Sequence, residues 1–217
     1  MLFTIGQIII IWRRLLKKIK GITPDLSIDE SLIIVASSAK VLEDSKGSVI
    51  DGFTDVIRFN RAPIDGYEKF IGSKTTIRVA NQHTFGNIPH TGWEIGDQRH
   101  DTFIKDQRDV NIVHLGPGLD IWDERSEHVH ESCKAFLVDY DGVVATLYPA
   151  LGHRPSVGFA FLWLCLNSGL KPTIFGYGLD EESYGHYYDE NAVSSHPFSI
   201  ERSIIQEWIQ SNDVKVL

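Results

Sequence analysis

Two histidines near the end of the chain have the residue types and spacing for acid/base chemistry. His186 opens the tetrapeptide HYYD, and His196 follows ten positions later, with Glu201 five positions further on. Histidine exchanges its proton near neutral pH, so such a pair can supply both a proton donor and a proton acceptor. The alternative is that one or both histidines belong to surface loops, and the elements that position them must decide.

The composition predicts one globular domain with a full core. The chain has 217 residues, of which 42% are apolar and 11% aromatic. A net charge of −8 excludes general nucleic-acid binding, which needs basic residues to neutralise phosphates. Cys133 and Cys165 are too few for a disulfide framework, and no cysteine or histidine cluster has zinc-ligand spacing. We therefore predict no structural metal and no cofactor.

Residues 1–20 form a separate segment ahead of a domain over residues 21–217. Residues 2–12 are nearly all apolar, and Arg13, Arg14, Lys17, Lys18 and Lys20 follow. The apolar run is well short of the roughly 20 residues that cross a bilayer, and its charges are on the wrong side for a secretory signal. The pattern favours a helix on a membrane surface, in peripheral contact with anionic headgroups. Packing on the domain or on a second copy is the alternative.

The remainder of the chain predicts an α/β sheet with helices on both faces. An apolar helix is expected at 157–168, followed at once by a strand. Short apolar runs typical of buried strands lie at 32–36, 56–59, 76–79, 112–115, 143–147 and 173–177.

Three polar or glycine-containing loops follow predicted strands and are candidates for a ligand site. They are 37–40, 60–63 and 176–180, and ligands of such sheets collect at the carboxyl ends of strands. Ser37, Ser38 and Asn60 can hydrogen-bond phosphate or ribose oxygens. The chain has neither GxGxxG nor GxxxxGK[ST], which excludes the standard dinucleotide and P-loop sites. Each loop alone is also compatible with a helix cap or turn.

Asp139 and Asp141 form a DxD pattern of the kind that holds a divalent metal in many sugar-nucleotide transferases. No third oxygen ligand can be nominated for Mg²⁺ or Mn²⁺, so a solvated turn is the favoured interpretation.

The loops and the histidine segment, taken in order, resemble the eukaryote-type sialyltransferases, glycosyltransferase family 29, in a compact bacterial or viral form. Residues 34–39, 49–63, 66–68 and 71–76 are similar to the large motif of that family, and 155–158 with 174–178 to its small motif. Residues 186–189 resemble the third motif, and 196–201 the very small motif, a histidine and a glutamate separated by four residues. No match is evident over 82–154.

The chain departs from the family pattern at two places. Leu32 and Gly169 stand where the family usually has the two cysteines of a disulfide, so that bridge is absent. Its loss fits folding in a reducing compartment. Ser37 stands where the first-strand loop of the family usually has an asparagine. We expect a cytoplasmic protein, peripheral at the inner membrane through residues 1–20, or a Golgi membrane protein if the source is eukaryotic.

The resemblance implies a single Rossmann-like domain, a GT-A-like variant with a mostly parallel twisted sheet. It also implies transfer of a sialic-acid-type sugar from its CMP conjugate to a glycan hydroxyl, with inversion and without a metal. The acceptor would be a galactoside on a glycolipid, lipooligosaccharide or glycoprotein. The alternatives are another CMP-activated keto-sugar such as Kdo, and a CMP-sugar or glycan-binding module without catalysis.

The expected roles of the site residues follow from the same resemblance. His196 is the better base, because Pro197 predicts a helix start there and the helix dipole disfavours a charged ring. Glu201, in the second turn, either supports the histidine loop or is only a favourable acid near the helix start. His186 contacts the leaving phosphate with Tyr188 beside it. The residues expected around the nucleotide are Ser37, Ser38, Asn60, Ser156, Val157, Gly158, Gly176, Tyr177 and Gly178.

Overall fold

The computed structural model describes residues 26–81, 84, 107, 109–116, 135–180, 185–189 and 197–217. The predicted N-terminal helix and the predicted base His196 lie outside these residues, as does Cys133. No helix within the described ranges is long and apolar enough to cross a membrane.

The fold is built on one sheet of seven strands in which every neighbouring pair is parallel. The strand order is β5-β4-β3-β2-β1-β6-β7. The α/β fold with a parallel sheet is therefore confirmed. The strands are β1 (Leu32–Val35), β2 (Asp55–Phe59), β3 (Ile77–Asn81), β4 (Asn111–Gly116), β5 (Ala135–Asp139), β6 (Thr173–Phe175) and β7 (Lys215–Val216).

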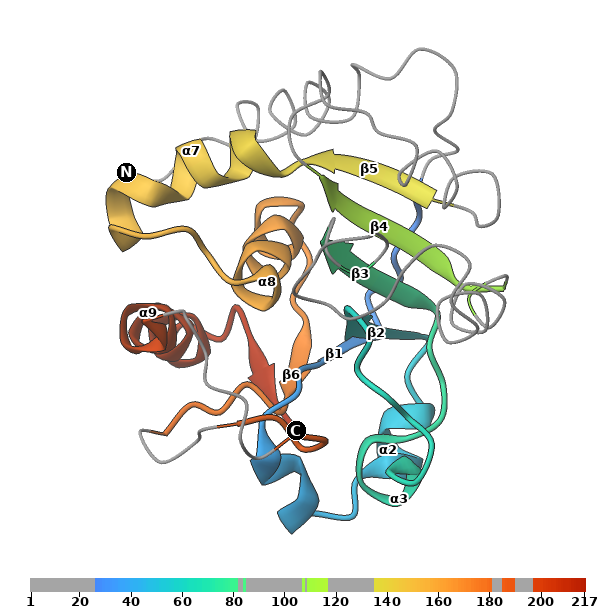
Figure 1. Cartoon of the computed structure of the whole chain (residues 1–217). Coiled ribbons are helices and arrows are strands. Elements are labelled where there is room, and N and C mark those ends of the chain that lie inside the picture. Colours follow the sequence, from blue (N-terminus) through green and yellow to red (C-terminus); the bar gives the residue numbers. More distant parts are fainter. Residues whose placement is uncertain are drawn as a thin grey trace.

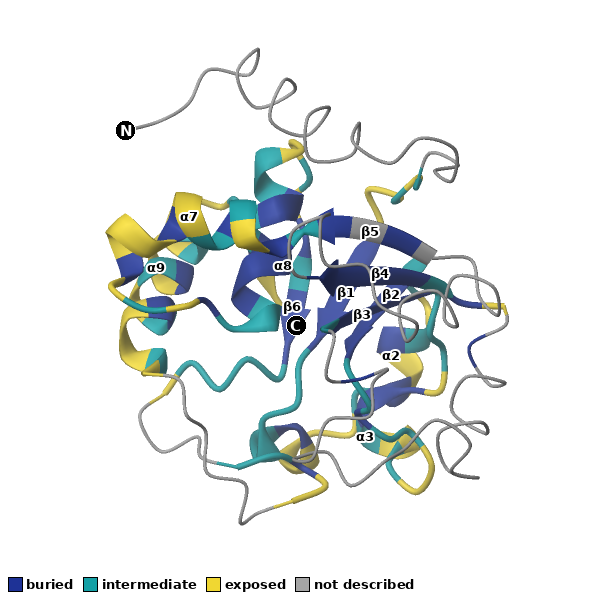
Figure 2. Cartoon of the chain, turned by 45° about the horizontal axis from the view of Figure 1, so that its top comes forward, coloured by how far each residue is buried: buried dark blue, intermediate teal, exposed yellow. Residues whose placement is uncertain are grey.

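Helices cover both faces of the sheet, as Figure 1 shows. One face packs against α7 (Tyr140–Leu151), α8 (Val157–Asn167) and α9 (Phe198–Gln210) through the larger hydrophobic core. The other face packs against η1 (Ala39–Glu43), α2 (Gly47–Asp51) and α3 (Glu68–Ile71) through a smaller core. Strands β1 to β4 and β6, between these two layers, are almost wholly buried (Figure 2), which explains why they appear in the sequence as mostly apolar runs.

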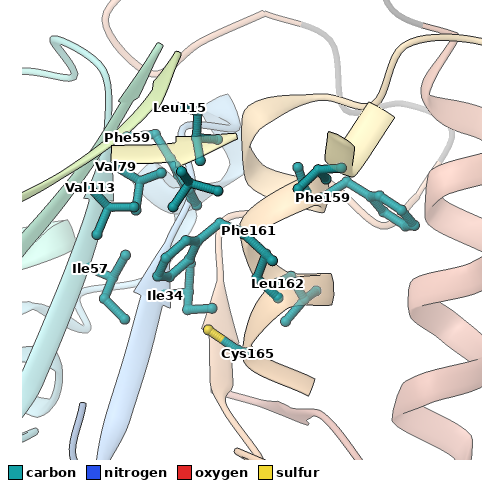
Figure 3. Close-up of a cluster of buried hydrophobic side chains, with 14 of the residues drawn as sticks. Ile34, Ile57, Phe59, Val79, Val113, Leu115, Phe159, Phe161, Leu162 and Cys165 are labelled. Carbon is teal, nitrogen blue, oxygen red and sulfur yellow. The ribbon is translucent and has the colours of Figure 1, made fainter. Parts of the chain in front are cut away.

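The central helix α8 forms because its sequence supplies a start signal and an apolar surface all round. The Ser156 side chain caps it by accepting a hydrogen bond from the Phe159 N–H at 3.1 Å. Phe161 reaches the sheet, where its ring meets the edge of Phe59 at 6.4 Å between centroids (Figure 3). The helix ends one residue before the predicted boundary. Burial of the whole helix fixes its place over the centre of the sheet.

The prediction of a strand at 143–147 is wrong, because these residues lie inside α7. The Asp139 carboxylate caps this helix by accepting from the Gly142 N–H at 3.0 Å, and Gly152 ends it in a left-handed conformation. The buried residues Tyr140, Val143, Leu147 and Leu151 follow helical spacing. The true strand, β5, lies just before the helix and was not predicted.

The other predicted strands are confirmed with small changes at their ends. Strand β3 begins one residue later and ends two residues later than predicted, and β6 stops two residues early, at Phe175, because Gly176 turns away with φ +74°. The short strand β7 was not predicted.

Candidate functional site

The order in which the strands are added to the sheet reverses at β1. Strands β2 to β5 lie on one side of it, and β6 lies on the other side although it comes about 140 residues later in the chain. Ligands of open parallel sheets bind outside the strand ends at such a switch point. The two loops that leave the sheet here are joined by backbone hydrogen bonds, Ala36 N to Phe175 O at 2.8 Å and Ser38 N to Gly176 O at 3.0 Å. The structure therefore brings the predicted loops 37–40 and 176–180 together.

Gly176 is required at this junction by its conformation and by its surroundings. A Cβ atom on this residue would lie 2.5 Å from Val41 Cγ1 and 2.7 Å from the Ala36 carbonyl oxygen. Gly178 also has positive φ, +58°. A pair of partly exposed side chains, Lys40 and Asp180, joins the same two loops by an ion pair of 2.6 Å. Tight backbone contact and an ion pair thus fix the loops relative to each other.

The histidine segment 185–189 lies directly against the loop after β1. The Tyr187 N–H donates to the Ser37 carbonyl at 3.0 Å, and His186 forms an isolated bridge with Ser38. His186 and Asp189 exchange two backbone hydrogen bonds of 3.0 Å, which close the segment into a tight turn. Two stretches of chain 149 positions apart are therefore one structural unit.

Tyr187 anchors this unit, and sequence analysis gave it no role. Its side chain is buried in the smaller core, where it meets the ring of Tyr67 edge-on at 4.8 Å between centroids. Its hydroxyl donates to the Pro63 carbonyl. Burial raises the pKa of the Tyr187 phenol well above its usual value, so the group stays neutral and acts as a donor. Tyr187 therefore faces the smaller core, whereas His186 and Tyr188 lie beside the loop after β1.

His186 and Tyr188 stack on each other beside Ser37. Their ring centroids are 5.0 Å apart at an interplanar angle of 12°, and His186 Nδ1 lies 2.9 Å from Ser37 Oγ. Partial burial raises the pKa of the Tyr188 phenol, and the Ser37 hydroxyl opposes that rise. Among the described residues, no protein group is bonded to His186 Nε2, so this nitrogen can face a ligand.

Asn60 ends β2 in a left-handed conformation with φ +45°. Its side-chain oxygen accepts from the Asn81 N–H at 3.2 Å and from the Thr84 hydroxyl at 2.9 Å. Its carbonyl accepts from Arg78 Nη1 at 2.8 Å. With its oxygen held by protein donors, the amide nitrogen is the atom that can serve a phosphate or hydroxyl group.

Arg58 and Arg78 are two fully buried cations on adjacent strands, opposite each other in register, and sequence analysis passed over both. Arg58 donates to the carbonyls of residues 71, 72 and 74, and Arg78 donates to Gln107 and to the loop after β2. Burial lowers the pKa of each to about 10. The sequence signal for this arrangement is an arginine inside each of two otherwise apolar runs, VIRF and TIRV. An arginine cannot be buried there without hydrogen-bond partners.

Ser156 and Glu201 join the start of α8 to the start of α9. One Glu201 oxygen accepts from the Ser156 N–H at 2.7 Å, and the other from the Ser156 hydroxyl at 2.6 Å. Glu201 is only 3% exposed and lies in the first turn of α9, so the prediction of the second turn is wrong. Pro197 is the residue before the helix, whereas it was expected to be the first helical residue. Both polar groups of Ser156 are thus used within the protein.

Tyr177 connects the start of α8 with the loop after β6. Its hydroxyl donates to the Gly158 carbonyl at 3.1 Å, and a Cβ on Gly158 would touch the Tyr177 and Phe59 rings at 3.7 Å. Burial raises the pKa of the Tyr177 phenol well above its usual value, so it remains a neutral donor. Val157 is half-buried as the first residue of α8. Residues 156–158 and 176–178 are therefore neighbours, as one ligand site would require.

The predicted DxD pair has structural partners. Asp139 caps α7, and Asp141 forms an exposed ion pair with Arg154 at 3.2 Å. Within the described ranges, no group of three or more histidine, cysteine, aspartate or glutamate side chains could hold a metal ion.

Residues 25–113 match the family model described as glycosyltransferase family 29 (sialyltransferase). The match includes β1, β2 and β3 with Ser37, Ser38 and Asn60, and it ends inside β4. It extends beyond residue 82, where no similarity was predicted, and that expectation is wrong. The predicted small, third and very small motifs lie outside the matched segment.

Curated relatives show the same similarity over a shorter span. The chain is 40% identical over 67 residues to a beta-galactoside alpha-2,6-sialyltransferase 2 of Takifugu rubripes, and 45% identical over 60 residues to the human protein of that name. These segments span 31% and 28% of this chain, but only 12% and 11% of the relatives.

Solved sialyltransferase structures share the fold of nearly the whole chain. A mammalian sialyltransferase in complex with Gal-beta-1-3GalNAc-ortho-nitrophenol superposes with a TM-score of 0.61 at 15% identity, covering 99% of this chain and 79% of that one. A monofunctional alpha-2,3-sialyltransferase of Campylobacter jejuni gives 0.55 at 14% identity, covering 90% of this chain and 79% of that one. Residues 25–113 thus match glycosyltransferase family 29, and the chain has the fold of the solved sialyltransferases.

Proposed function

We propose that this protein transfers sialic acid from CMP-sialic acid to a hydroxyl of an acceptor glycan. The observation that carries the proposal is the family 29 match over residues 25–113, because this segment holds the loops after β1 and β2 at the switch point. A galactoside is the acceptor class we propose, since the curated relatives are named for beta-galactosides.

The donor nucleotide binds at the carboxyl ends of β1, β2 and β6. Backbone N–H groups of the closely packed loops and the amide nitrogen of Asn60 supply donors for phosphate and ribose oxygens. The joined helix starts at Ser156 and Glu201 form one wall. Val157 and Gly158 lie at this wall, near the ribose or base.

The reaction is a single displacement at the anomeric carbon. The acceptor oxygen forms a bond to that carbon while the bond from the carbon to the CMP phosphate oxygen breaks, and CMP leaves with the electron pair. His196 takes the acceptor proton, and His186 stabilises the negative charge that develops on the phosphate. The stack of Tyr188 on His186 holds the ring beside the leaving group.

The decisive assay is incubation with CMP-sialic acid or CMP-Kdo and a panel of galactosides, followed by mass spectrometry. We expect a product heavier than the acceptor by one sialic acid residue. Product with CMP-Kdo alone would assign the other donor, and CMP binding without any product would favour a binding module. Either result would contradict the proposal.

Replacing either histidine by alanine tests the assigned roles. We expect His186→Ala and His196→Ala each to lower kcat by about 10²- to 10⁴-fold, the usual range for acid/base groups. Unchanged melting temperature and CMP affinity of each variant are the controls for folding and site integrity. Full turnover by a variant that still binds CMP would remove that histidine from the mechanism.

A further inference from the structure

We infer that Ser37 is a positioning residue for His186, which it holds through Nδ1 so that Nε2 carries the proton that faces the leaving phosphate. The inference rests on the proposed function for the identity of the ligand. Its structural part, the state of the imidazole ring, can be tested without any substrate. It gives Ser37 a different task from direct phosphate binding, the role suggested by its place in the loop.

The contact between the two side chains is specific. Ser37 Oγ and His186 Nδ1 are 2.9 Å apart, a full hydrogen bond. The same two segments are joined through the backbone, where Tyr187 N donates to the Ser37 carbonyl at 3.0 Å and Ser38 bridges His186. Because the backbone bonds and the buried Tyr187 fix the segment without the hydroxyl, the Ser37 side chain is free to act on the ring alone.

The direction of the hydrogen bond determines which nitrogen carries the proton. A serine hydroxyl has one hydrogen to donate and two lone pairs to accept. When it donates to Nδ1, the neutral ring must carry its hydrogen on Nε2. We assign the serine hydroxyl as the donor in the 2.9 Å contact, and the position of the ring hydrogen follows from this assignment.

The stack between His186 and Tyr188 restrains the orientation of the imidazole ring, in addition to the hydrogen bond at Nδ1. At 5.0 Å and 12°, the tyrosine limits rotation of the imidazole out of its plane. One nitrogen is bonded to Ser37, and among the described residues the other has no protein partner. An N–H at Nε2 is thus presented to any anion that binds beside the loop after β1.

The first test is NMR of the full-length protein with labelled histidine, at a pH where titration shows the His186 ring to be neutral. We expect ¹⁵N shifts of a ring protonated at Nε2 in the wild type, a mixed tautomer in Ser37→Ala, and the wild-type shifts in Ser37→Thr, which keeps the hydroxyl. Ser38→Ala is the matched control, because its hydroxyl caps η1 and should not alter the ring shifts. Identical His186 shifts in wild type and Ser37→Ala would overturn the inference.

The second test is a double-mutant cycle in the transferase assay. Loss of one hydrogen bond predicts a fall in kcat of roughly 2- to 12-fold for Ser37→Ala, with little change in donor KM. In the His186→Ala background the same change should have less than about a 2-fold effect, because Ser37 acts through the ring. An equal loss in both backgrounds, or a rise in KM alone, would instead show that Ser37 binds the donor directly.

The two tests separate failure of the inference from failure of the proposed function. If no donor is turned over, the proposed function fails while the NMR experiment still decides the state of the ring. If turnover is normal and the His186 shifts do not respond to Ser37→Ala, the inference fails and the proposed function stands.

Discussion

Glu201 is a buried carboxylate whose two oxygens are both bonded to one residue, Ser156. Ser156 in turn caps α8 through the Phe159 N–H. A carboxylate in this position satisfies donors at a helix N-terminus, where negative charge is favoured by the helix dipole. Because Glu201 belongs to α9, the same bonds also join the start of α9 to the start of α8.

We expect Glu201→Gln to lower the free energy of unfolding by about 2 kcal/mol, because charge-assisted hydrogen bonds to a buried group are lost. Chemical denaturation monitored by tryptophan fluorescence measures the change. Glu207→Gln on the exposed side of α9 is the matched control and should stay within about 0.5 kcal/mol of the wild type. Equal stability of both variants would show that the Ser156 contact contributes nothing.

At the residue scale, the sequence indicated which polar residues could bind a ligand better than it indicated which other residues hold them in place. Ser37, Asn60 and His186 were predicted because polar residues at strand ends and in family-like motifs are recognisable. The bond from Thr84 to Asn60 was not predictable, since it depends on how a loop 24 positions away returns to the strand end. Tyr187 was also missed, because its burial depends on a core face that only the assembled sheet creates.

At the element scale, α7 was mistaken for a strand because Val143, Val144 and Thr146 are β-branched residues in an apolar run. Pro149 inside the helix also argued against helical structure. The better signals were the Asp139 cap, the terminal Gly152 and apolar residues spaced by three and four. In α7, packing of an apolar helical face against the core outweighed the strand propensity of these residues.

Gly176 marks the end of β6, and we expect Gly176→Ala to destabilise the protein by roughly 3 kcal/mol or more. The new methyl group would meet the Ala36 carbonyl in addition to the strain of a left-handed residue. Gly152→Ala is the control, with φ +72° and no atom within 4 Å of the added Cβ, and should cost only about 1 kcal/mol. Thermal unfolding of both variants separates the cost of the steric clash from the cost of the left-handed conformation. Equal losses of stability in the two variants would exclude the clash.

Asp51 holds the turn after α3 in place. Its carboxylate accepts from the N–H groups of Ser73 and Lys74, each at 2.9 Å, and from the Ser73 hydroxyl at 2.9 Å. Partial burial alone would raise the pKa of Asp51, but these hydrogen bonds outweigh it and lower the pKa below the usual 3.8. The carboxylate therefore contributes stability above the unfolded-state pKa, and loses it as the pH falls through the folded-state pKa.

We expect Asp51→Asn to cost about 1 kcal/mol at pH 7, a modest value because the side chain is partly exposed. The difference from the wild type should shrink as the pH is lowered through the acid range below about 4. Denaturant unfolding over a pH series measures it, with the exposed Asp65→Asn as the control. A difference that stays constant down to the acid limit would mean that the carboxylate charge is not the cause.

At the scale of the whole molecule, the sequence predicted a parallel sheet but not the order of its strands. The central strands are mostly apolar and buried, so their hydrophobic pattern does not distinguish one neighbour from another. The position of β6 beside β1 depends on α7 and α8 crossing one face of the sheet. That crossing creates the switch point and with it the candidate site.

Residues 1–20 carry the proposal of peripheral membrane contact. We expect the full chain to co-sediment with vesicles containing anionic lipid, and a chain lacking residues 1–20 to remain in the supernatant. Binding should weaken as salt is raised, because the five cations act through screened charge. Equal partitioning of both proteins would refute the proposal, and neutral vesicles serve as the lipid control.

The central position of β1 also has a consequence for synthesis on the ribosome. Its partner β2 follows within about twenty residues, whereas its other partner, β6, is made after Thr173. Until β6 is made, one edge of β1 has no neighbouring strand, and its residues are ones that are buried in the folded protein. Such an edge can recruit strands from other chains. The nascent protein therefore passes through a stage with an unpaired strand edge, which ends once β6 has emerged and paired with β1.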